Sequence, residues 1–329
     1  MSSTSTPSNR HAERVVLVSL MKSGTHLIQE LMVALGYGVY GSSRTPPEIQ
    51  PVLDEETQHR MVRMVHGEDS HKRFAAGDAA TFARTAQEAW EALGWAWQLR
   101  LGMPLESRYG AEMVNADLVQ QALARTVGTP FAMTPADVCW VATELDVKKV
   151  DGAFLQEWSQ TREPRIVYMY RDPRDTVLSM VNFLSGLTAQ GFGNYSDFQV
   201  FNRILNGKAS LEERLTYALS DPAFPGNGDH RRNLWLLHHP DVCKVSFEEL
   251  VGPSGGGSTT AQLAAVARVA EFLGAKGDPM DLGRHLFRRD AFSFFKGQIG
   301  AWREVFTREH RSLAAERLGA AVELYGYAA

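Results

Sequence analysis

The sequence has only two cysteines among 329 residues, and this scarcity excludes a small fold held together by disulfides. Cys139 and Cys243 each lie in an apolar run, so we expect buried free thiols, which suit a reducing cytoplasm. No apolar run approaches the length of a membrane span, and the polar residues 1–13 lack the hydrophobic core of a signal peptide. The sequence therefore predicts a cytoplasmic protein with a disordered tail over residues 1–13.

An excess of charge of one sign is also missing. The net charge is −4, and the 22% of charged and 44% of hydrophobic residues are those of an ordinary soluble globular protein. This balance gives no reason to expect binding to nucleic acid or to a membrane surface. The chain is long enough for one large α/β domain or for two smaller ones.

The most informative stretch covers residues 15–36. Residues 15–18 are apolar and predict a short buried strand, residues 22–25 form a polar turn, and apolar residues then recur at helical spacing up to Gly36. A strand, a short loop and a helix start direct free backbone N–H groups and the positive end of the helix at one point. This arrangement favours an anion, and phosphate above all.

Four residues of this turn are candidates for contact with the anion. Gly24 would let the backbone approach the ligand, Lys22 would add a cation, and Thr25 and His26 would add donors. The nucleotide-triphosphatase loop G-x-x-x-x-G-K-[ST] is absent, because the lysine precedes the glycine, so a different phosphate ligand is implied. A plain strand–turn–helix connection with a solvated lysine explains this stretch alone equally well.

Further strands are expected over residues 138–143, 165–170 and 241–247, with helices between them. This alternation predicts a three-layer α/β fold with a mostly parallel central sheet. We expect one domain over residues 14–329, with a loop over 38–51 and a helical insertion over about 45–130. Other expected features are a flexible loop at 255–258 and helices over 261–273 and 307–325.

A second cationic residue stands at the end of a strand. Arg171 follows the strand at 165–170, and a helix begins directly after it. Asp172 is a suitable N-cap, Pro173 suits the first helical position, and Asp175 suits the first turn. Taken alone, the arginine is best explained as a surface ion pair with Asp172 or Asp175.

Four separated segments resemble one family, the PAPS-dependent sulfotransferases. Lys22-Ser23-Gly24-Thr25 resembles their 5′-phosphosulfate loop, and residues 170–179 resemble their 3′-phosphate motif, with Arg171 and Ser179 eight residues apart. Residues 295–307 resemble the C-terminal R-K-G-x-x-G-x-W-x-x-x-F-T segment, and residues 246–250 resemble the family's Y-E-D-L. The order of the four segments is that of the family.

The resemblance implies transfer of a sulfuryl group from PAPS to a hydroxyl or phenol of a small molecule by in-line displacement. PAPS, 3′-phosphoadenosine 5′-phosphosulfate, is then the co-substrate, and PAP, 3′-phosphoadenosine 5′-phosphate, is the product. The resemblance implies that no metal is required, and it is compatible with a homodimer. The residues implied in nucleotide binding are Lys22, Ser23, Gly24, Thr25, His26, Arg171, Ser179, Phe295, Lys296 and Gly297.

Two departures from the family pattern concern nucleotide affinity. Phe295 replaces an arginine that contacts the 3′-phosphate, and Arg303 or Arg289 are candidates to supply that contact. Leu27 replaces the tryptophan that stacks on adenine, so adenine must rest on aliphatic surface or on another aromatic ring.

The implied catalytic residues are Lys22, Glu144 and His26. Lys22 would stabilise charge on the bridging and leaving oxygens, and His26 could donate to the departing oxygen. Glu144 takes the place of the family's catalytic histidine as general base, if an apolar site raises its pKa. The alternative is a polar residue at a strand end. His66 and His71, in the helical insertion, are rival bases, although a solvated position is the simpler explanation of each.

The insertion is expected to cover the acceptor pocket. Its aromatic residues Trp90, Trp95, Trp97 and Tyr109 are better explained as core than as a ligand-facing surface. Two other functions stay open: a catalytically silent relative that binds PAP or PAPS, and a phosphoryl-transferring enzyme, for which the sequence shows neither a magnesium carboxylate nor a glycine-rich lead-in.

Overall fold

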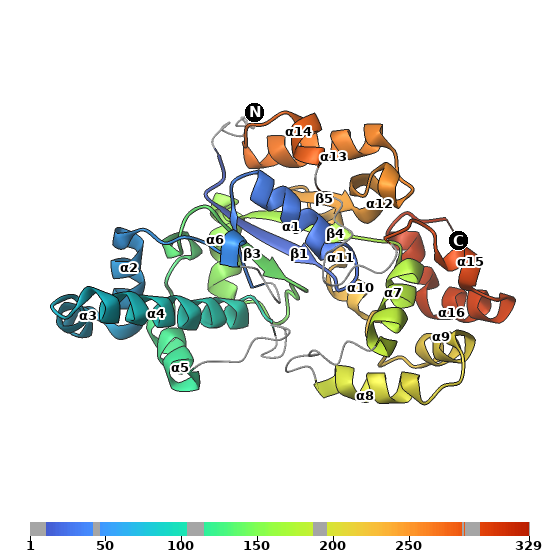
Figure 1. Ribbon diagram of the computed structural model, residues 1–329, viewed down its shortest axis with the longest axis horizontal. Coiled ribbons are helices and arrows are strands. Elements are labelled where there is room, and N and C mark those ends of the chain that lie inside the picture. Colours follow the sequence, from blue (N-terminus) through green and yellow to red (C-terminus); the bar gives the residue numbers. More distant parts are fainter. Residues whose placement is uncertain are drawn as a thin grey trace.

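The computed structural model describes residues 11–41, 47–103, 115–186, 196–284, 286 and 297–328. These residues form a five-stranded, wholly parallel sheet in the order β2-β3-β1-β4-β5 (Figure 1). The strands are β1 (Arg14–Ser19), β2 (Gly38–Tyr40), β3 (Val138–Ala142), β4 (Arg165–Tyr170) and β5 (Val242–Ser246). The predicted α/β fold with a mostly parallel central sheet is confirmed.

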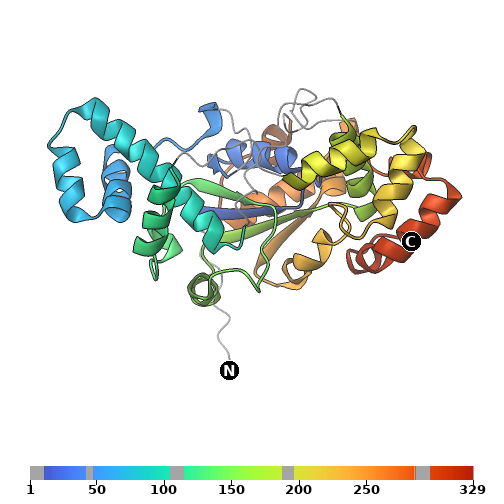
Figure 2. The same cartoon turned by 90° about the horizontal axis from the view of Figure 1, so that it is seen from below.

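Alternate residues of the strands build two separate apolar layers, because successive side chains point to opposite faces. Val16 and Val18 lie in one cluster, and Val15 and Leu17 lie in the other. The helices on the first face are α2 (Glu55–His66), α4 (Ala79–Arg100), α5 (Ala116–Arg125), α6 (Gly152–Thr161) and α11 (Leu234–His238). Those on the second are α1 (Thr25–Ala34), α12 (Phe247–Leu250), α13 (Thr259–Leu273) and α14 (Pro279–Gly283). Three layers result, as expected (Figure 2).

A third apolar cluster lies beside the sheet and packs helices against one another. It is built by α7 (Pro173–Ser185), α8 (Ser196–Asn206), α9 (Leu211–Ser220), α15 (Trp302–Val305) and α16 (Arg308–Leu324). Thr307 caps α16 and Gly326 follows it with φ 77°, so the predicted last helix is confirmed. The short α10 (Asp229–Arg232) precedes α11.

The described part of the expected insertion is mostly helical, and some of it projects from the body of the molecule. Asp78 caps α4 by accepting from the Thr81 N–H at 2.9 Å. Trp90, Trp95 and Trp97 are at most 3% exposed and belong to the core, whereas Tyr109 lies outside the described residues. The hairpin of α2 and α3 (Glu68–Ala75) extends away from the sheet (Figure 1), and α3 buries none of its residues.

Two expected loops contain regular structure. Gly38–Tyr40 is strand β2, paired with β3, and Pro47–Ile49 forms a 3₁₀ turn, so the loop expected over 38–51 was wrong in part. Three residues beside a glycine give too short a pattern to identify a strand. Residues 253–255 also form a 3₁₀ turn, and the Gly255 carbonyl accepts from the Ile299 N–H at 3.0 Å, so this end of the expected flexible loop is held in place.

Residues 1–10 of the expected tail lie outside the described residues, and its last part packs against the fold. Ala12 is 3% exposed, and its N–H donates to the Leu273 carbonyl at 2.8 Å. The two cysteines are buried and free, as predicted. Within the described ranges, no helix is long and apolar enough to cross a membrane.

Candidate anion-binding site

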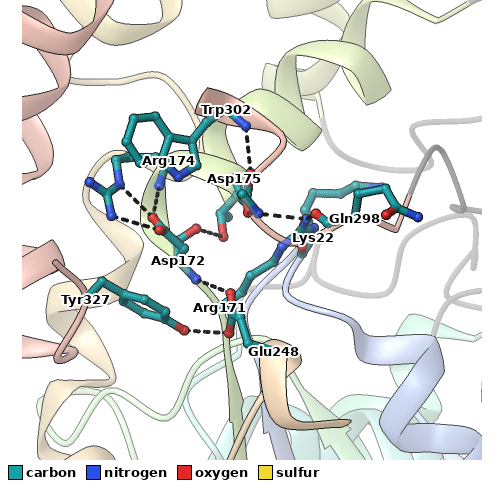
Figure 3. A network of polar contacts seen from close by, with 11 residues as sticks. Lys22, Arg171, Asp172, Arg174, Asp175, Glu248, Gln298, Trp302 and Tyr327 are labelled. Atoms are coloured by element: carbon teal, nitrogen blue, oxygen red, sulfur yellow. Dashed lines mark hydrogen bonds and ion pairs between the residues drawn. The ribbon is translucent and has the colours of Figure 1, made fainter. Parts of the chain in front are cut away.

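The carboxyl ends of β1 and β4 meet at one edge of the sheet, because the two strands are parallel neighbours with Ser19 beside Met169. In open parallel sheets, ligands bind at this edge. The chain leaving β1 and the chain leaving β4 therefore bring Lys22 and Arg171 together, although 148 residues separate them. Arg171 Nη1 donates to the Lys22 carbonyl at 3.3 Å (Figure 3).

The first loop has an unusual backbone that opens the start of α1. Lys22 and Gly24 both have left-handed conformations, with φ values of 67° and 100°. Gly24 is the N-cap of α1, and no side chain caps this helix. The first N–H groups of α1 therefore lack a capping side chain, which leaves a positive helix end suited to an anion.

Gly24 has a structural role that spacing alone did not show. A Cβ atom at this position would lie 2.7 Å from Met169 Cε and 2.8 Å from Phe247 Cδ2. The positive φ also disfavours any side chain here. The loop thus packs directly on β4 and α12, so glycine is required whether or not a ligand approaches.

Two buried polar atoms at the site have no hydrogen-bond partner among the described residues. They are Ser23 Oγ and Arg171 Nε, from residues that are 0% and 7% exposed. An unsatisfied buried donor is costly, and an anionic ligand with several acceptor oxygens would satisfy it. The residues present therefore fit a phosphate or sulfate group. Thr25 Oγ1, the neighbouring hydroxyl, lies 2.8 Å from Ser19 Oγ.

The surroundings of Lys22 and His26 disfavour the charged form of each side chain. Burial, followed by the charge of Arg171, lowers the pKa of Lys22 to about 7. Burial and then the charge of Lys22 lower the pKa of His26. Lys22 Nζ lies 4.3 Å from the ring centre of Phe183 on α7, a cation–π contact that the sequence analysis missed. Only the spacing of Phe183 one turn after Ser179 could have indicated it.

Arg171 joins three segments of the chain. Besides the Lys22 carbonyl, it donates from Nη2 to the Gln298 carbonyl at 2.9 Å, and its guanidinium lies over the Phe247 ring at 4.2 Å. Arg171 Nη2 lies 3.8 Å from Asp175 Oδ2, so an ion pair with Asp175 is present, but it is buried and not on the surface. The arginine is thus buried between the loop after β1, α12 and the chain before α15.

The start of α7 is as the sequence predicted, and Asp175 has a further role. Asp172 caps the helix, and Pro173 occupies the first turn. Asp175 accepts from the N–H groups of Gly300 and Trp302 at 2.7 and 3.0 Å, which fixes the approach to α15. Ser179 is half-buried further along α7.

Of the other residues that the sequence analysis linked to nucleotide binding, the structure describes only some. Phe295, Lys296 and Arg289 lie outside the described residues, whereas Gly297 is described and has φ 59°. Arg303 lies over the ring of Trp302 at 4.9 Å. Leu27 is 8% exposed and packs in the apolar cluster on one face of the sheet, so it offers no open platform for adenine.

Glu144 lies just after β3 and is held by two cations. Its Oε1 is 3.2 Å from Lys149 Nζ, and its Oε2 is 2.5 Å from Arg232 Nε. The residue is 7% exposed. Both oxygens are therefore engaged, and the surroundings are charged, unlike the apolar site that the sequence analysis required for a general base.

The rival histidines lie in the projecting hairpin. His71 Nε2 is 2.8 Å from His59 Nδ1, and both rings pack against Phe82. His66 packs against the ring of Phe74. Both rivals are half-buried. Helices α2 and α3 lie far from α7 in both views (Figures 1 and 2).

The fold and site define an α/β protein with a cationic edge on a parallel sheet, whose donors suit an anion. No family model and no curated protein matches the sequence. Among the described residues, no group of three or more His, Cys, Asp and Glu side chains is arranged to hold a metal ion.

Solved structures resemble the chain over most of its length. Mouse sulfotransferase SULT7A1 complexed with PAP has a TM-score of 0.48 at 15% identity, covering 97% of this chain and 90% of that one. Retinol dehydratase in complex with androsterone and the inactive cofactor PAP has a TM-score of 0.44 at 17% identity, covering 97% and 83%.

Proposed function

We propose that the protein is a PAPS-dependent sulfotransferase that acts on the hydroxyl or phenol of a small molecule. One observation supports this most: two donor sets, the Lys22 loop with the start of α1 and Arg171 at the end of β4, meet at one sheet edge. Each set contains a buried polar atom without a partner among the described residues. PAPS carries two anionic ends on one adenosine, so it matches two adjoining donor sets.

We assign the 5′ end of the nucleotide to the first loop, and the 3′-phosphate to Arg171, to Ser179 on α7 and to the chain before α15. Ser23 Oγ and the first N–H groups of α1 are the proposed donors at the 5′ end. The full set of proposed nucleotide-binding residues is Lys22, Ser23, Gly24, Thr25, His26, Arg171, Ser179, Phe295, Lys296 and Gly297.

PAPS supplies the sulfuryl group when it is bound. Lys22, in the first loop, is the proposed source of positive charge for the bridging and leaving oxygens, where negative charge develops. A nearby anion favours the ammonium form of this lysine. His26 is the proposed second donor to the leaving oxygen. Because a sulfuryl group carries less charge than a phosphoryl group, we propose that these cations suffice without a metal ion.

Glu144 is the proposed general base, and its ion pairs set a condition on this role. A carboxylate oxygen can take the acceptor's proton only if it lies within hydrogen-bond reach of that proton. Either Lys149 or Arg232 must therefore release an oxygen when the acceptor binds. The same two ion pairs favour the second candidate function, a catalytically silent protein that binds PAP or PAPS.

Two assays test the proposal and separate the two candidates. Calorimetric titration with PAP should show 1:1 binding, and labelled PAPS with a panel of hydroxylated acceptors should yield PAP and a sulfated product in the presence of a metal chelator. Binding without transfer to any acceptor would support the silent protein. A protein that binds neither PAP nor PAPS would contradict both. We further propose a cytoplasmic location, as the free thiols suggest.

A further inference from the structure

The peptide group that joins Arg171 to Asp172 is held by a carboxylate from another element. Glu248 on α12 accepts the Asp172 N–H through Oε1 at 3.1 Å. Its other oxygen, Oε2, accepts the hydroxyl proton of Tyr327 at 2.7 Å (Figure 3). Because a peptide group is planar, fixing this N–H also fixes the position of the Arg171 Cα atom.

Tyr327 contacts the chain on both sides of Arg171. Its ring lies 6.5 Å, centre to centre, from that of Tyr170, which precedes the arginine. Its hydroxyl reaches the following residue, Asp172, through Glu248. Burial raises the pKa of Tyr327, so the hydroxyl keeps its proton and stays a donor across the physiological range.

The next residue along the chain strengthens the same connection. The carbonyl of Ala328 accepts from Arg174 Nη2 at 2.7 Å. Arg174 in turn binds both carboxylate oxygens of Asp172, at 3.0 and 2.9 Å. The segment after α16 thus secures the backbone of Asp172 through Glu248 and its side chain through Arg174.

We propose that Tyr327 and Glu248 are positioning residues that orient Arg171 for an anionic group on the nucleotide's 3′ position. The inference rests on the proposed function, because it assigns a 3′-phosphate to Arg171. Glu248 directs the backbone of the arginine and leaves its guanidinium bound to the carbonyls of Lys22 and Gln298, with Nε facing no partner among the described residues. The segment after α16 therefore belongs functionally to the nucleotide site.

The test compares affinity for PAP with affinity for adenosine 5′-monophosphate, which lacks the 3′-phosphate. If Arg171 is no longer held in position, only the affinity for PAP should fall. A general loss of stability should lower the affinity for both ligands equally. We use the ratio of the dissociation constant of adenosine 5′-monophosphate to that of PAP, which falls when PAP binding alone weakens. For Tyr327→Phe, which removes only the hydroxyl, we expect this ratio to fall about tenfold, equal to about 1.4 kcal/mol. Calorimetry on the full chain measures both constants.

Tyr325→Phe is the matched control. Its hydroxyl lies in the same turn and is also buried, but it contacts the Tyr168 hydroxyl and donates to the His230 carbonyl, at 2.6 and 2.8 Å. We expect a comparable loss of thermal stability and an unchanged ratio. An unchanged ratio in Tyr327→Phe, or an equal fall in Tyr325→Phe, would overturn the proposal.

A second variant tests whether the hydroxyl acts through the carboxylate. In Glu248→Ala the ratio should fall at least as far, and adding Tyr327→Phe should lower it no further, because both residues act on one path. Additive losses would contradict that path. If the unmodified protein binds PAP no better than adenosine 5′-monophosphate, the assignment of the 3′-phosphate fails first, and with it the proposed function.

Discussion

Three structural features meet at Lys22. Its backbone is left-handed, its side chain is half-buried, and its ammonium group lies near the guanidinium of Arg171. Burial and this neighbouring charge disfavour the ammonium form, and the Phe183 ring offsets part of that effect. An arriving anion reverses the balance, so the unfavourable state of the free protein becomes favourable in the complex.

Replacement of this lysine by methionine should change how stability depends on pH. The pKa of Lys22 falls from 10.5 to about 7 on folding, so between these values the unfolded chain binds one more proton than the folded protein. The lysine's contribution to stability therefore rises with pH across this window, and below pH 7 the cost of burying the ammonium group is complete. The free energy of unfolding of the unmodified protein, minus that of Lys22→Met, should be lowest near pH 6 and should increase as the pH rises to 9. Denaturant unfolding of both proteins at each pH measures this difference, and parallel curves would contradict the assigned pKa.

Glu144→Gln should abolish turnover while PAP binding stays nearly intact. The amide has almost the same shape but cannot take a proton, and a general base contributes about 10²–10⁴-fold to the rate. Steady-state rates with labelled PAPS and calorimetry with PAP measure the two effects. His66→Ala and His71→Ala are the comparison variants and should keep near-normal rates. The reverse pattern would move the base to the projecting hairpin.

Sequence reasoning found the cationic residues of the site but not their partners. The proximity of Lys22 and Arg171 follows from two strand ends that share one sheet edge, which the motif order made predictable. The two cations that hold Glu144 could not be predicted, because Arg232 comes from a distant helix and contacts it only in the folded chain. The role of Phe183 was missed for the same reason.

At the scale of elements, the glycines at the two ends of α1 offer a direct test of packing. Both have positive φ, 100° for Gly24 and 95° for Gly36, so alanine pays a similar backbone cost of roughly 1–2 kcal/mol at each position. Only at Gly24 would the added Cβ meet Met169 and Phe247, whereas nothing lies within 4 Å at Gly36. Gly24→Ala should therefore destabilise the protein by about 1–3 kcal/mol more than Gly36→Ala. Denaturant unfolding measures both, and equal losses would show that the loop tolerates the methyl group.

Elements with strong local signals were predictable, and those defined by pairing were not. The start of α7 was clear from an N-cap aspartate followed by proline, and the end of α1 from Gly36. Strand β2 has only three residues and exists because β3 lies beside it. Residues 255–258 appeared flexible from composition, yet the Gly255 carbonyl accepts a hydrogen bond from the Ile299 N–H.

At the scale of the whole molecule, the site is an assembly of distant segments. Arg171, which follows β4, contacts the chain after β1, helix α12 and the residue Gln298. Each segment comes from a different part of the fold, so the site exists only when the sheet and the helices beside it are complete. A ligand that binds two of these segments at once should therefore stabilise the entire fold.

PAP should raise the melting temperature more than either of its halves. At a free concentration of 100 times its dissociation constant, a ligand that binds only the folded state adds about 2.7 kcal/mol, which for a chain of this length is about 4 °C. At the same concentration, adenosine 5′-monophosphate and adenosine 3′-monophosphate each engage one donor set, and their shifts should be small, because the second contact of PAP is intramolecular. Differential scanning fluorimetry with a metal chelator present measures all three. If one monophosphate matches PAP, only one donor set binds the nucleotide, and the two-ended site is wrong.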